Sequence, residues 1–282
     1  DADRQELQTA YHFDYVSMAK TPDGYALADF KDVFTRWDSA FAEKGWLAIF
    51  LSNHDNSRLV NRYGNPSPAF RIPSTQMLHT FLLSMRGTPY TYYGDEIGMT
   101  NIDMPNIEEY VDVAAKGEYR AALVAEEDLD EFMRLLNYRS RENSRTPMQW
   151  DTTYQAGFTT GDPWKKVNAN HQSINVAAQD QDPASILNHF RAMTKVRREN
   201  PVLVYGRYEL IQREHPDIYA FTRSWEGDKM LVLLNFSNAP ASIELNANAG
   251  FENIVINNYP SLQTDGPRLS LEPYQAVICK IE

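Results

Sequence analysis

A histidine and a carboxylate that follow a short apolar run are the residues best placed for chemistry. Residues 47–51 (Leu-Ala-Ile-Phe-Leu) have the pattern of a strand buried on both faces of a parallel sheet, and the next four residues, ending in His54 and Asp55, are polar. Side chains at the carboxyl ends of parallel strands gather on one rim of an α/β barrel, where reactive groups lie. There, an imidazole beside a carboxylate can bind vicinal hydroxyls or carry out acid–base chemistry; a polar cap on the strand is the structural alternative.

The elements expected to position these residues alternate between strand and helix. Apolar residues at helical spacing predict a helix over residues 77–85, with Gly87 just past its end, and residues 89–93 are predicted to form a second short strand. Helical spacing returns over residues 185–200, where Pro201 closes the helix. This order favours a parallel α/β sheet, open or closed into a barrel.

A long excursion, residues 100–182, interrupts this alternation. Residues 114–136 are predicted to be helical and are heavily charged, and residues 141–164 are rich in turn formers and aromatic side chains. An excursion of this length between barrel elements is usually functional rather than only a connection. The acidic run at residues 126–131 is interpreted as a solvated helix face.

The pattern changes after residue 203 to short β-type runs separated by Gly, Asn, Pro and Asp. The runs are residues 218–223, 230–236, 242–245, 254–256 and 276–281. Short strands at near-regular spacing predict an antiparallel sandwich or a barrel-like domain. We therefore predict a first domain at residues 1–203, which includes the excursion as a loop subdomain, and a β-sandwich domain at residues 204–282.

Composition excludes several classes of protein. The 282 residues contain 27 Lys+Arg against 38 Asp+Glu, a net charge of −11 that argues against nucleic-acid binding. We find no apolar run near the roughly 20 residues of a membrane-spanning helix, so no membrane partner is expected. Cys279 is the single cysteine, which excludes an intrachain disulfide framework and leaves the compartment open. The histidines lack metal-ligand spacing and no phosphate-binding glycine loop is present, so neither a metal nor a cofactor is predicted.

Three ordered strings resemble a known family. Residues 50–58 (Phe-Leu-Ser-Asn-His-Asp-Asn-Ser-Arg) resemble the fourth conserved region of the alpha-amylase family, glycoside hydrolase family 13. Residues 87–99 resemble that family's eighth barrel strand and the loop after it, and residues 140–151 resemble a string of its oligo-1,6-glucosidase and alpha-glucosidase branch. The resemblance covers nearly the whole chain. It implies an α/β fold: the C-terminal half of a TIM (β/α)8 barrel followed by an antiparallel all-β C-terminal domain.

The resemblance also implies roles for single residues. Asp55 matches the family's transition-state-stabilising carboxylate, and His54 matches its hydroxyl-binding neighbour. Arg141 is expected to face the site, whereas Arg145 and Arg58 are interpreted as structural, Arg58 as a brace for the Asp55 loop. A further set of aromatic residues is expected to line sugar subsites, with core packing as the alternative reading of each: Phe13, Tyr92, Trp150 and Trp164.

The chain departs from the family at its reacting carboxylates. No string matches the family's nucleophile Asp, its acid/base Glu or its earlier Asp-x-x-x-Asn-His string, and residues 11–14 resemble the sixth barrel strand, which follows all three. Asp14, Asp95 and Glu96 do not match the reacting positions. The chain begins without Met and without a signal segment, so we expect processing or a longer parent polypeptide. Alone, the chain is expected to be inactive, and its half-barrel edge to associate with the missing half or with itself.

The function implied is that of a retaining alpha-glucosidase acting on short alpha-glucosides such as isomalto- or malto-oligosaccharides or sucrose. Two alternatives remain: a transglycosylating enzyme of the sucrose isomerase or trehalulose synthase type, and a non-catalytic carbohydrate-binding or scaffold protein of the same fold. The resemblance decides neither 1,4 against 1,6 linkage preference nor calcium binding, because the residues concerned lie in the unmatched half of the family.

Overall fold

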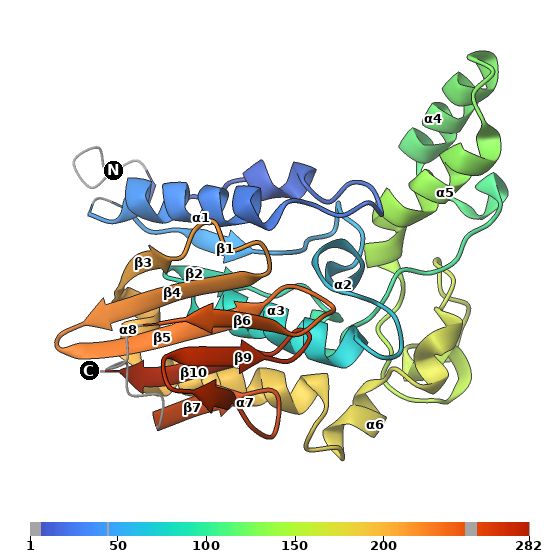
Figure 1. Ribbon diagram of the computed structural model, residues 1–282. Coiled ribbons are helices and arrows are strands. Elements are labelled where there is room, and N and C mark those ends of the chain that lie inside the picture. Colours follow the sequence, from blue (N-terminus) through green and yellow to red (C-terminus); the bar gives the residue numbers. More distant parts are fainter. Residues whose placement is uncertain (1–6, 44, 246–252, 282) are drawn as a thin grey trace.

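Three parallel chain segments position the predicted rim. In the computed structural model, which describes residues 7–43, 45–245 and 253–281, strand β1 (Ala48–Phe50) pairs in parallel with β2 (Thr88–Tyr90) (Figure 1). Leu47 forms a parallel bridge with Ala10, which adds a third segment to the same sheet. Within residues 11–14, predicted to be a strand, the chain instead enters a 3-10 helix, η1 (Asp14–Ser17).

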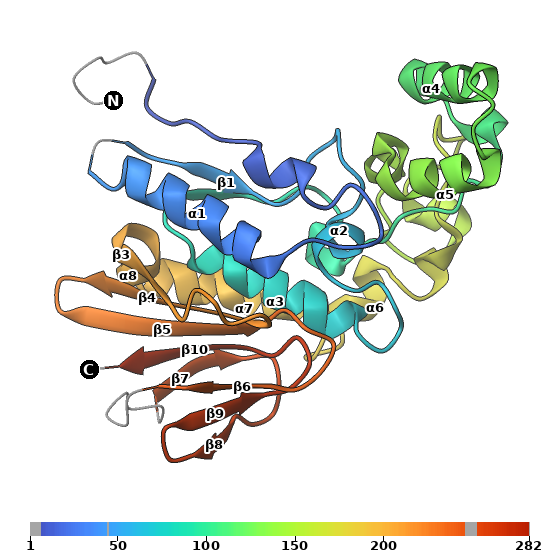
Figure 2. The ribbon, with the colours of Figure 1, turned by 45° about the horizontal axis from the view of Figure 1, so that its top comes forward.

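A helix follows each parallel segment, as in a β/α barrel. These helices are α1 (Leu27–Phe41), α3 (Arg71–Ser84), which the short α2 (Leu59–Tyr63) precedes, and α7 (Ile186–Glu199), after which comes α8 (Pro201–Tyr205). Every side chain from Ser74 to Ser84 is buried, because α3 lies between the parallel strands and a β-sheet (Figure 2). The predicted closure by Pro201 is correct only in part, since Pro201 also occupies the first turn of α8.

Gly87 has a different role from the predicted helix end. Helix α3 ends at Ser84, and Met85 is already extended, so Gly87 is not the residue just past the helix. Its φ is +115°, and a Cβ atom there would lie 2.4 Å from the carbonyl oxygen of Leu47. The glycine is required because β1 and β2 approach closely at this point.

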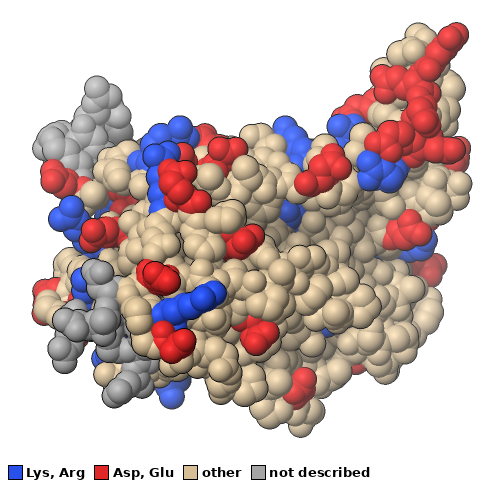
Figure 3. All heavy atoms as spheres, in the orientation of Figure 1, with Lys and Arg blue, Asp and Glu red and all other residues tan. Residues whose placement is uncertain are grey.

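The excursion between β2 and α7 contains mostly short helices. They are η2 (Asp95–Ile97), η3 (Ile107–Glu109), α4 (Val113–Val124), α5 (Leu129–Arg139), η4 (Arg141–Arg145), η5 (Tyr154–Gly157), η6 (Ala169–Gln172) and α6 (Val176–Asp180). The helix predicted over 114–136 is therefore two helices, and both begin at an Asp N-cap. They project from the body (Figure 1), and exposed acidic side chains gather on the projection (Figure 3): Glu118, Glu126, Glu127, Asp128, Asp130 and Glu131.

The C-terminal residues form two antiparallel sheets, which confirms the predicted fold class. The strands are β3 (Arg207–Ile211), β4 (Ile218–Trp225), β5 (Asp228–Asn235), β6 (Ala241–Glu244), β7 (Asn253–Asn257), β8 (Gln263–Asp265), β9 (Arg268–Leu271) and β10 (Ala276–Ile281). They are ordered β3-β4-β5-β10-β7 and β6-β9-β8. The sequence reading missed β3, β8 and β9.

The five-stranded sheet is buried on both faces, and its side chains alternate between two cores. Tyr219 and Phe221 of β4 pack in the core shared with the barrel helices, whereas Ile218 and Ala220 pack against the three-stranded sheet. The larger core thus runs across residue 203, which lies inside α8. The division into domains at that residue stays a prediction.

Candidate active site

Asp55 lies in the loop after β1, held by a local turn. The side chain of Asn53 accepts hydrogen bonds from the backbone N–H of Asp55 at 2.8 Å and from the Asn56 amide at 2.7 Å, so the loop folds around its own asparagine. The His54 Nε2 atom is 3.2 Å from Asp55 Oδ2. The side chains of both residues stay open to solvent, with exposed fractions of 68% for His54 and 52% for Asp55.

Two arginines from η4 reach the other oxygen of Asp55. Arg145 Nη2 donates to Asp55 Oδ1 at 2.9 Å, and Arg145 Nε donates to the carbonyl oxygen of His54 at 3.0 Å. Arg141 Nη1 is 3.5 Å from the same Oδ1 atom. Arg145 is therefore the closer partner of Asp55, through one carbonyl and one carboxylate bond, and its interpretation as a structural arginine stays a prediction. No sequence spacing signals this contact, because the two residues are 90 positions apart.

A second carboxylate anchors Arg141. Asp112 accepts two hydrogen bonds from the Arg141 guanidinium, at Oδ1 over 2.7 Å and at Oδ2 in a shorter contact, and its Oδ1 also caps α4 at the N–H of Ala114. The hydrogen bond from Arg141 is the main cause that lowers the pKa of Asp112, and the same bond raises the pKa of Arg141. The rim therefore holds two carboxylates and two guanidinium groups as a charge-balanced set.

Arg58, interpreted from the sequence as a brace for the Asp55 loop, reaches the loop after β2 and the η4 segment. The guanidinium is buried and donates to Tyr93 O at 2.7 Å, Asn143 O at 3.0 Å and Thr146 Oγ1 at 3.0 Å. It also lies 5.0 Å from the centroid of the Tyr93 ring. Arg58 thus contacts both the loop after β2 and the η4 segment, which Tyr93 Oη also joins by donating to Ser144 O at 2.9 Å.

Two hollows flank the rim. A groove of about 420 Å³ is lined by Asp55, Arg141 and Asp112 among others. Arg145 lines a second hollow of about 500 Å³, which is rich in aromatic side chains. Its rings include the predicted subsite residues Tyr92, Trp150 and Trp164, together with Tyr93 and Phe158, which the sequence reading missed.

Phe13 lies with other aromatic rings near the end of β1. Its ring packs edge-on against Tyr11 and against Phe50, with centroids 5.3 Å and 5.7 Å apart. The Phe13 side chain is 53% exposed. The structure thus leaves a ring face available on the segment before η1, while the predicted role of that face in substrate binding stays a prediction.

Three further acidic residues of interest have other contacts, and one of them, Glu96, lines the aromatic hollow. Asp14 is exposed and accepts hydrogen bonds from Arg36 and from Trp37 Nε1. Asp95 is buried beside Ser52, and burial raises the pKa of Asp95 to about 7. Glu96 accepts a 2.6 Å hydrogen bond from the backbone N–H of Gly94.

Within the described residues, no group of three or more His, Cys, Asp or Glu side chains is arranged to hold a metal ion. Over the same residues, no helix has both the length and the apolar composition needed to cross a membrane.

Comparison with known proteins identifies the family. Residues 1–206 match the family model of the alpha-amylase catalytic domain. The chain belongs to the alpha-amylase family. Residues 218–278 match a second model, the C-terminal domain of the alpha-amylase SusG, which agrees with the two C-terminal sheets.

Curated members of the alpha-amylase family resemble the chain along its whole length. It is 36% identical to an oligo-1,6-glucosidase of Parageobacillus thermoglucosidasius, with 100% of the chain and 52% of that protein covered. It is 34% identical to an alpha-glucosidase of Schizosaccharomyces pombe, with 99% and 51% covered. The chain therefore spans about half the length of these relatives.

Solved structures likewise match the whole chain over about half of their own length. The trehalulose synthase MutB of Pseudomonas mesoacidophila superposes with a TM-score of 0.93 at 36% identity, covering 100% of the chain and 52% of MutB. The isomaltulose synthase of a Klebsiella species superposes with a TM-score of 0.93 at 33% identity, again covering 100% and 52%.

Proposed function

We propose that this chain forms part of a retaining alpha-glucosidase that acts on short alpha-glucosides, with Asp55 as the carboxylate that stabilises the transition state. The observation that carries the proposal is the position of Asp55 after β1, where Arg145 holds one oxygen and His54 lies beside the other. Preorganised polar contacts of this kind act mainly on the transition state. The relatives named oligo-1,6-glucosidase and alpha-glucosidase support the substrate class.

The neighbouring side chains then have distinct roles in substrate binding. His54 Nε2 and Asp55 Oδ2, which are 3.2 Å apart, are spaced to contact vicinal hydroxyls of one glucose. Arg141 lines the groove on the same side and donates to sugar oxygens or orients Asp55. Phe13 offers its exposed ring to a sugar face.

Retention requires two further carboxyl groups, a nucleophile and an acid/base, about 5–5.5 Å apart. We infer that both lie outside the 282 residues, because no string in the chain matches either position. On this proposal residues 1–282 alone are inactive.

The open face of the parallel sheet supports a partner for this half-barrel. The aromatic side chains of Tyr11 and Tyr90 are 59% and 57% exposed, at the two outer segments of the sheet. We propose that the remaining strands of the barrel cover this face. In light scattering, residues 1–282 should form a complex with a polypeptide that supplies those strands; a compact monomer that binds no such polypeptide contradicts the proposal, and self-association alone replaces it by a dimer.

The activity is tested in the complete polypeptide encoded by the gene that contains this sequence. Hydrolysis of p-nitrophenyl alpha-glucoside and of isomaltose should fall by about 10²–10³ in kcat on Asp55→Asn. Asp32→Asn is the matched control, since Asp32 is an exposed carboxylate bound by the Arg213 guanidinium on the surface. An unchanged rate in Asp55→Asn refutes the role assigned to Asp55. A parent-like rate from residues 1–282 alone refutes the expectation that they are inactive. Sugar binding by the complete polypeptide without turnover supports a non-catalytic protein.

The structures of trehalulose synthase and isomaltulose synthase support a second candidate, a transglycosylating sucrose isomerase. Both reactions use one site and differ in how well it excludes water. Product analysis with sucrose separates them: glucose and fructose indicate hydrolysis, and an isomeric disaccharide indicates transglycosylation.

A further inference from the structure

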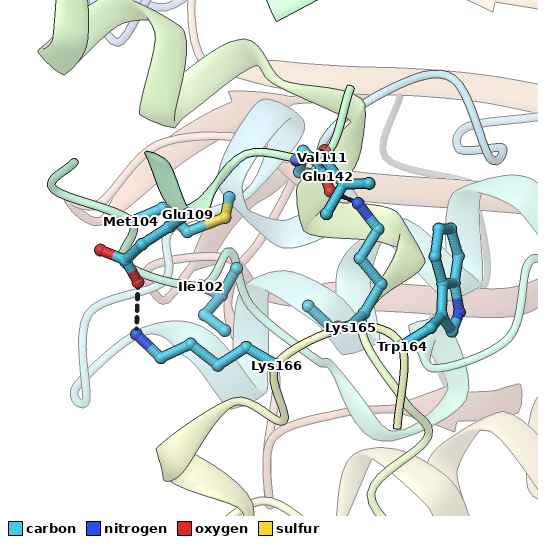
Figure 4. A pocket seen from close by; sticks show the side chains of 9 residues that line it. Ile102, Met104, Glu109, Val111, Glu142, Trp164, Lys165 and Lys166 are labelled. Atoms are coloured by element: carbon cyan, nitrogen blue, oxygen red, sulfur yellow. Dashed lines mark hydrogen bonds and ion pairs between the residues drawn. The ribbon is translucent and has the colours of Figure 1, made fainter. Parts of the chain in front are cut away.

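A buried ion pair lies behind the Asp55 site, in a cavity of about 180 Å³ within the excursion. Figure 4 shows Glu142 and Lys165 pointing toward each other among the residues that line it. Their side chains are 2% and 7% exposed, and the Lys165 ammonium contacts Glu142 Oε2. Removing two charges from water has a desolvation cost that the pair must offset by further bonds. The other contacts of Glu142 therefore show what the pair does.

Glu142 uses its second oxygen to hold the backbone before α4. Glu142 Oε1 accepts hydrogen bonds from the N–H groups of Val111 at 2.8 Å and Asp112 at 2.6 Å. Arg141, its neighbour in η4, binds both carboxylate oxygens of the same Asp112. Two consecutive residues of η4 thus hold Asp112: Glu142 binds the backbone N–H of Asp112, and Arg141 binds the Asp112 carboxylate.

We propose that Glu142, neutralised by Lys165, is a positioning residue for the Asp55 site. It fixes Asp112, and through Asp112 it fixes the direction in which the Arg141 guanidinium faces Asp55. Arg141 is a long side chain, 38% exposed, and its contact with Asp55 is 3.5 Å. At that separation a small displacement of Asp112 breaks the contact. The inference rests on the proposed function, in which Arg141 and Asp55 face the sugar.

A neighbouring pair supplies a control within the same cavity. Lys166 and Glu109 form an ion pair at 2.8 Å (Figure 4), but the Lys166 side chain is 59% exposed. Exposed pairs of this kind contribute little, and neither residue is bonded to the backbone of Asp112. Lys166→Met therefore changes a lysine of the same segment and leaves in place the contacts that run from Glu142 through Asp112 to Arg141.

The kinetic test compares four variants of the complete polypeptide on p-nitrophenyl alpha-glucoside. Glu142→Gln and Lys165→Met each leave one charge buried without its partner, and each should lower kcat by about 10- to 100-fold with a smaller change in KM. The double variant removes both charges and keeps an amide oxygen that accepts the two N–H groups, so it should recover to within about threefold of the parent. Lys166→Met should match the parent. Single variants with parent-like kcat, or a folded double variant without recovery, overturn the proposal.

A second measurement uses the complete polypeptide and needs no catalysis. Glu142→Ala should speed amide hydrogen exchange at Val111 and Asp112 by about tenfold or more, and should shift the NMR signal of the Arg141 Nε–H group. Glu109→Ala should change neither. If the amides are released while the Arg141 signal stays in place, Glu142 holds only the backbone and the proposal is wrong. Should the complete polypeptide turn over no alpha-glucoside, the proposed function fails, and this measurement still decides the positioning role.

Discussion

Replacement of Arg58 by methionine tests how the rim of the site is held together. Methionine keeps much of the length of arginine but has no donor, so Tyr93 O loses its donor in a buried place, while Asn143 O and Thr146 Oγ1 lose the guanidinium but keep the bond between them. Each unsatisfied buried group costs about 1–3 kcal/mol. Loss of the cation over the Tyr93 ring adds about 0.5–2 kcal/mol. Removal of the buried guanidinium and entry of water offset part of the total, so we expect a loss of about 2–4 kcal/mol in the free energy of unfolding.

The three acceptors lie in loops rather than in strands, so the damage should be local before it is global. In Arg58→Met we expect faster amide exchange across residues 143–146 and the loop after β1, and a weaker Arg145–Asp55 contact. Urea unfolding followed by tryptophan fluorescence gives the total, and hydrogen-exchange mass spectrometry gives the location.

Arg223→Met is the matched control for this experiment. Arg223 is as buried as Arg58, and its guanidinium likewise donates to backbone carbonyls, those of Ser84 at 3.2 Å and Gly206 at 2.6 Å. Because these contacts lie between α3 and the five-stranded sheet, the variant should lower global stability and leave exchange at residues 143–146 unchanged. A loss below about 1 kcal/mol in Arg58→Met, or equal exchange patterns in both variants, would refute the bracing role.

Three other perturbations have expected outcomes that simple unfolding experiments check. Burial raises the pKa of Asp95 from 3.8 to about 7, so the folded state loses stability as the pH rises through that window, by up to about 4 kcal/mol; Asp95→Asn should remove this slope from urea unfolding measured between pH 4 and pH 8. Burial lowers the pKa of His189 from 6.5 to about 4. The contribution of His189 to the free energy of unfolding is therefore complete above pH 6.5 and falls by up to about 3 kcal/mol as the pH drops toward 4. His189→Gln should flatten this pH dependence in urea unfolding, and an unchanged slope contradicts the expectation. Gly87→Ala should cost about 3 kcal/mol or more, because the added Cβ meets Leu47 O at 2.4 Å, whereas Gly24→Ala, with φ +86° and no neighbour within 4 Å, isolates the backbone strain and should cost less.

The sequence predicted the rim better than the parts that hold it. An apolar run followed by Ser-Asn-His-Asp is a local signal, and β1 with Asp55 after it lies where that signal places them. The partner of Asp55 is not a local signal. Arg145 is interpreted as structural because loop arginines usually bond locally. Its contact with Asp55 depends on how the chain folds back, which spacing in one sequence does not show.

Helices and strands that are buried on every face, or exposed on every face, are harder to predict from sequence than amphipathic ones. Helix α3 begins at Arg71, six residues before the predicted start, because its first residues include the polar Ser74, Thr75 and Gln76, which are buried and break the apolar stripe. Strand β8 is exposed at all three positions, so it has no alternation to detect. The Glu142–Lys165 pair joins residues 23 positions apart, and no local pattern in the sequence links them.

The charges at the rim bear on what Asp55 can do by itself. Asp55 and Asp112 carry two negative charges, and Arg141 and Arg145 carry two positive charges within hydrogen-bond or ion-pair reach. Because this set has no net charge, Asp112 and the two arginines are assigned to orienting hydroxyls and Asp55 rather than to neutralising a sugar cation. On the proposed function, the negative charge that the transition state requires must then come from the nucleophile and from Asp55 Oδ2, the oxygen that neither arginine holds. The two oxygens of Asp55 then have different functions: Oδ1, bound by the arginines, fixes the orientation of the carboxylate, and Oδ2, beside His54, stays open to the substrate.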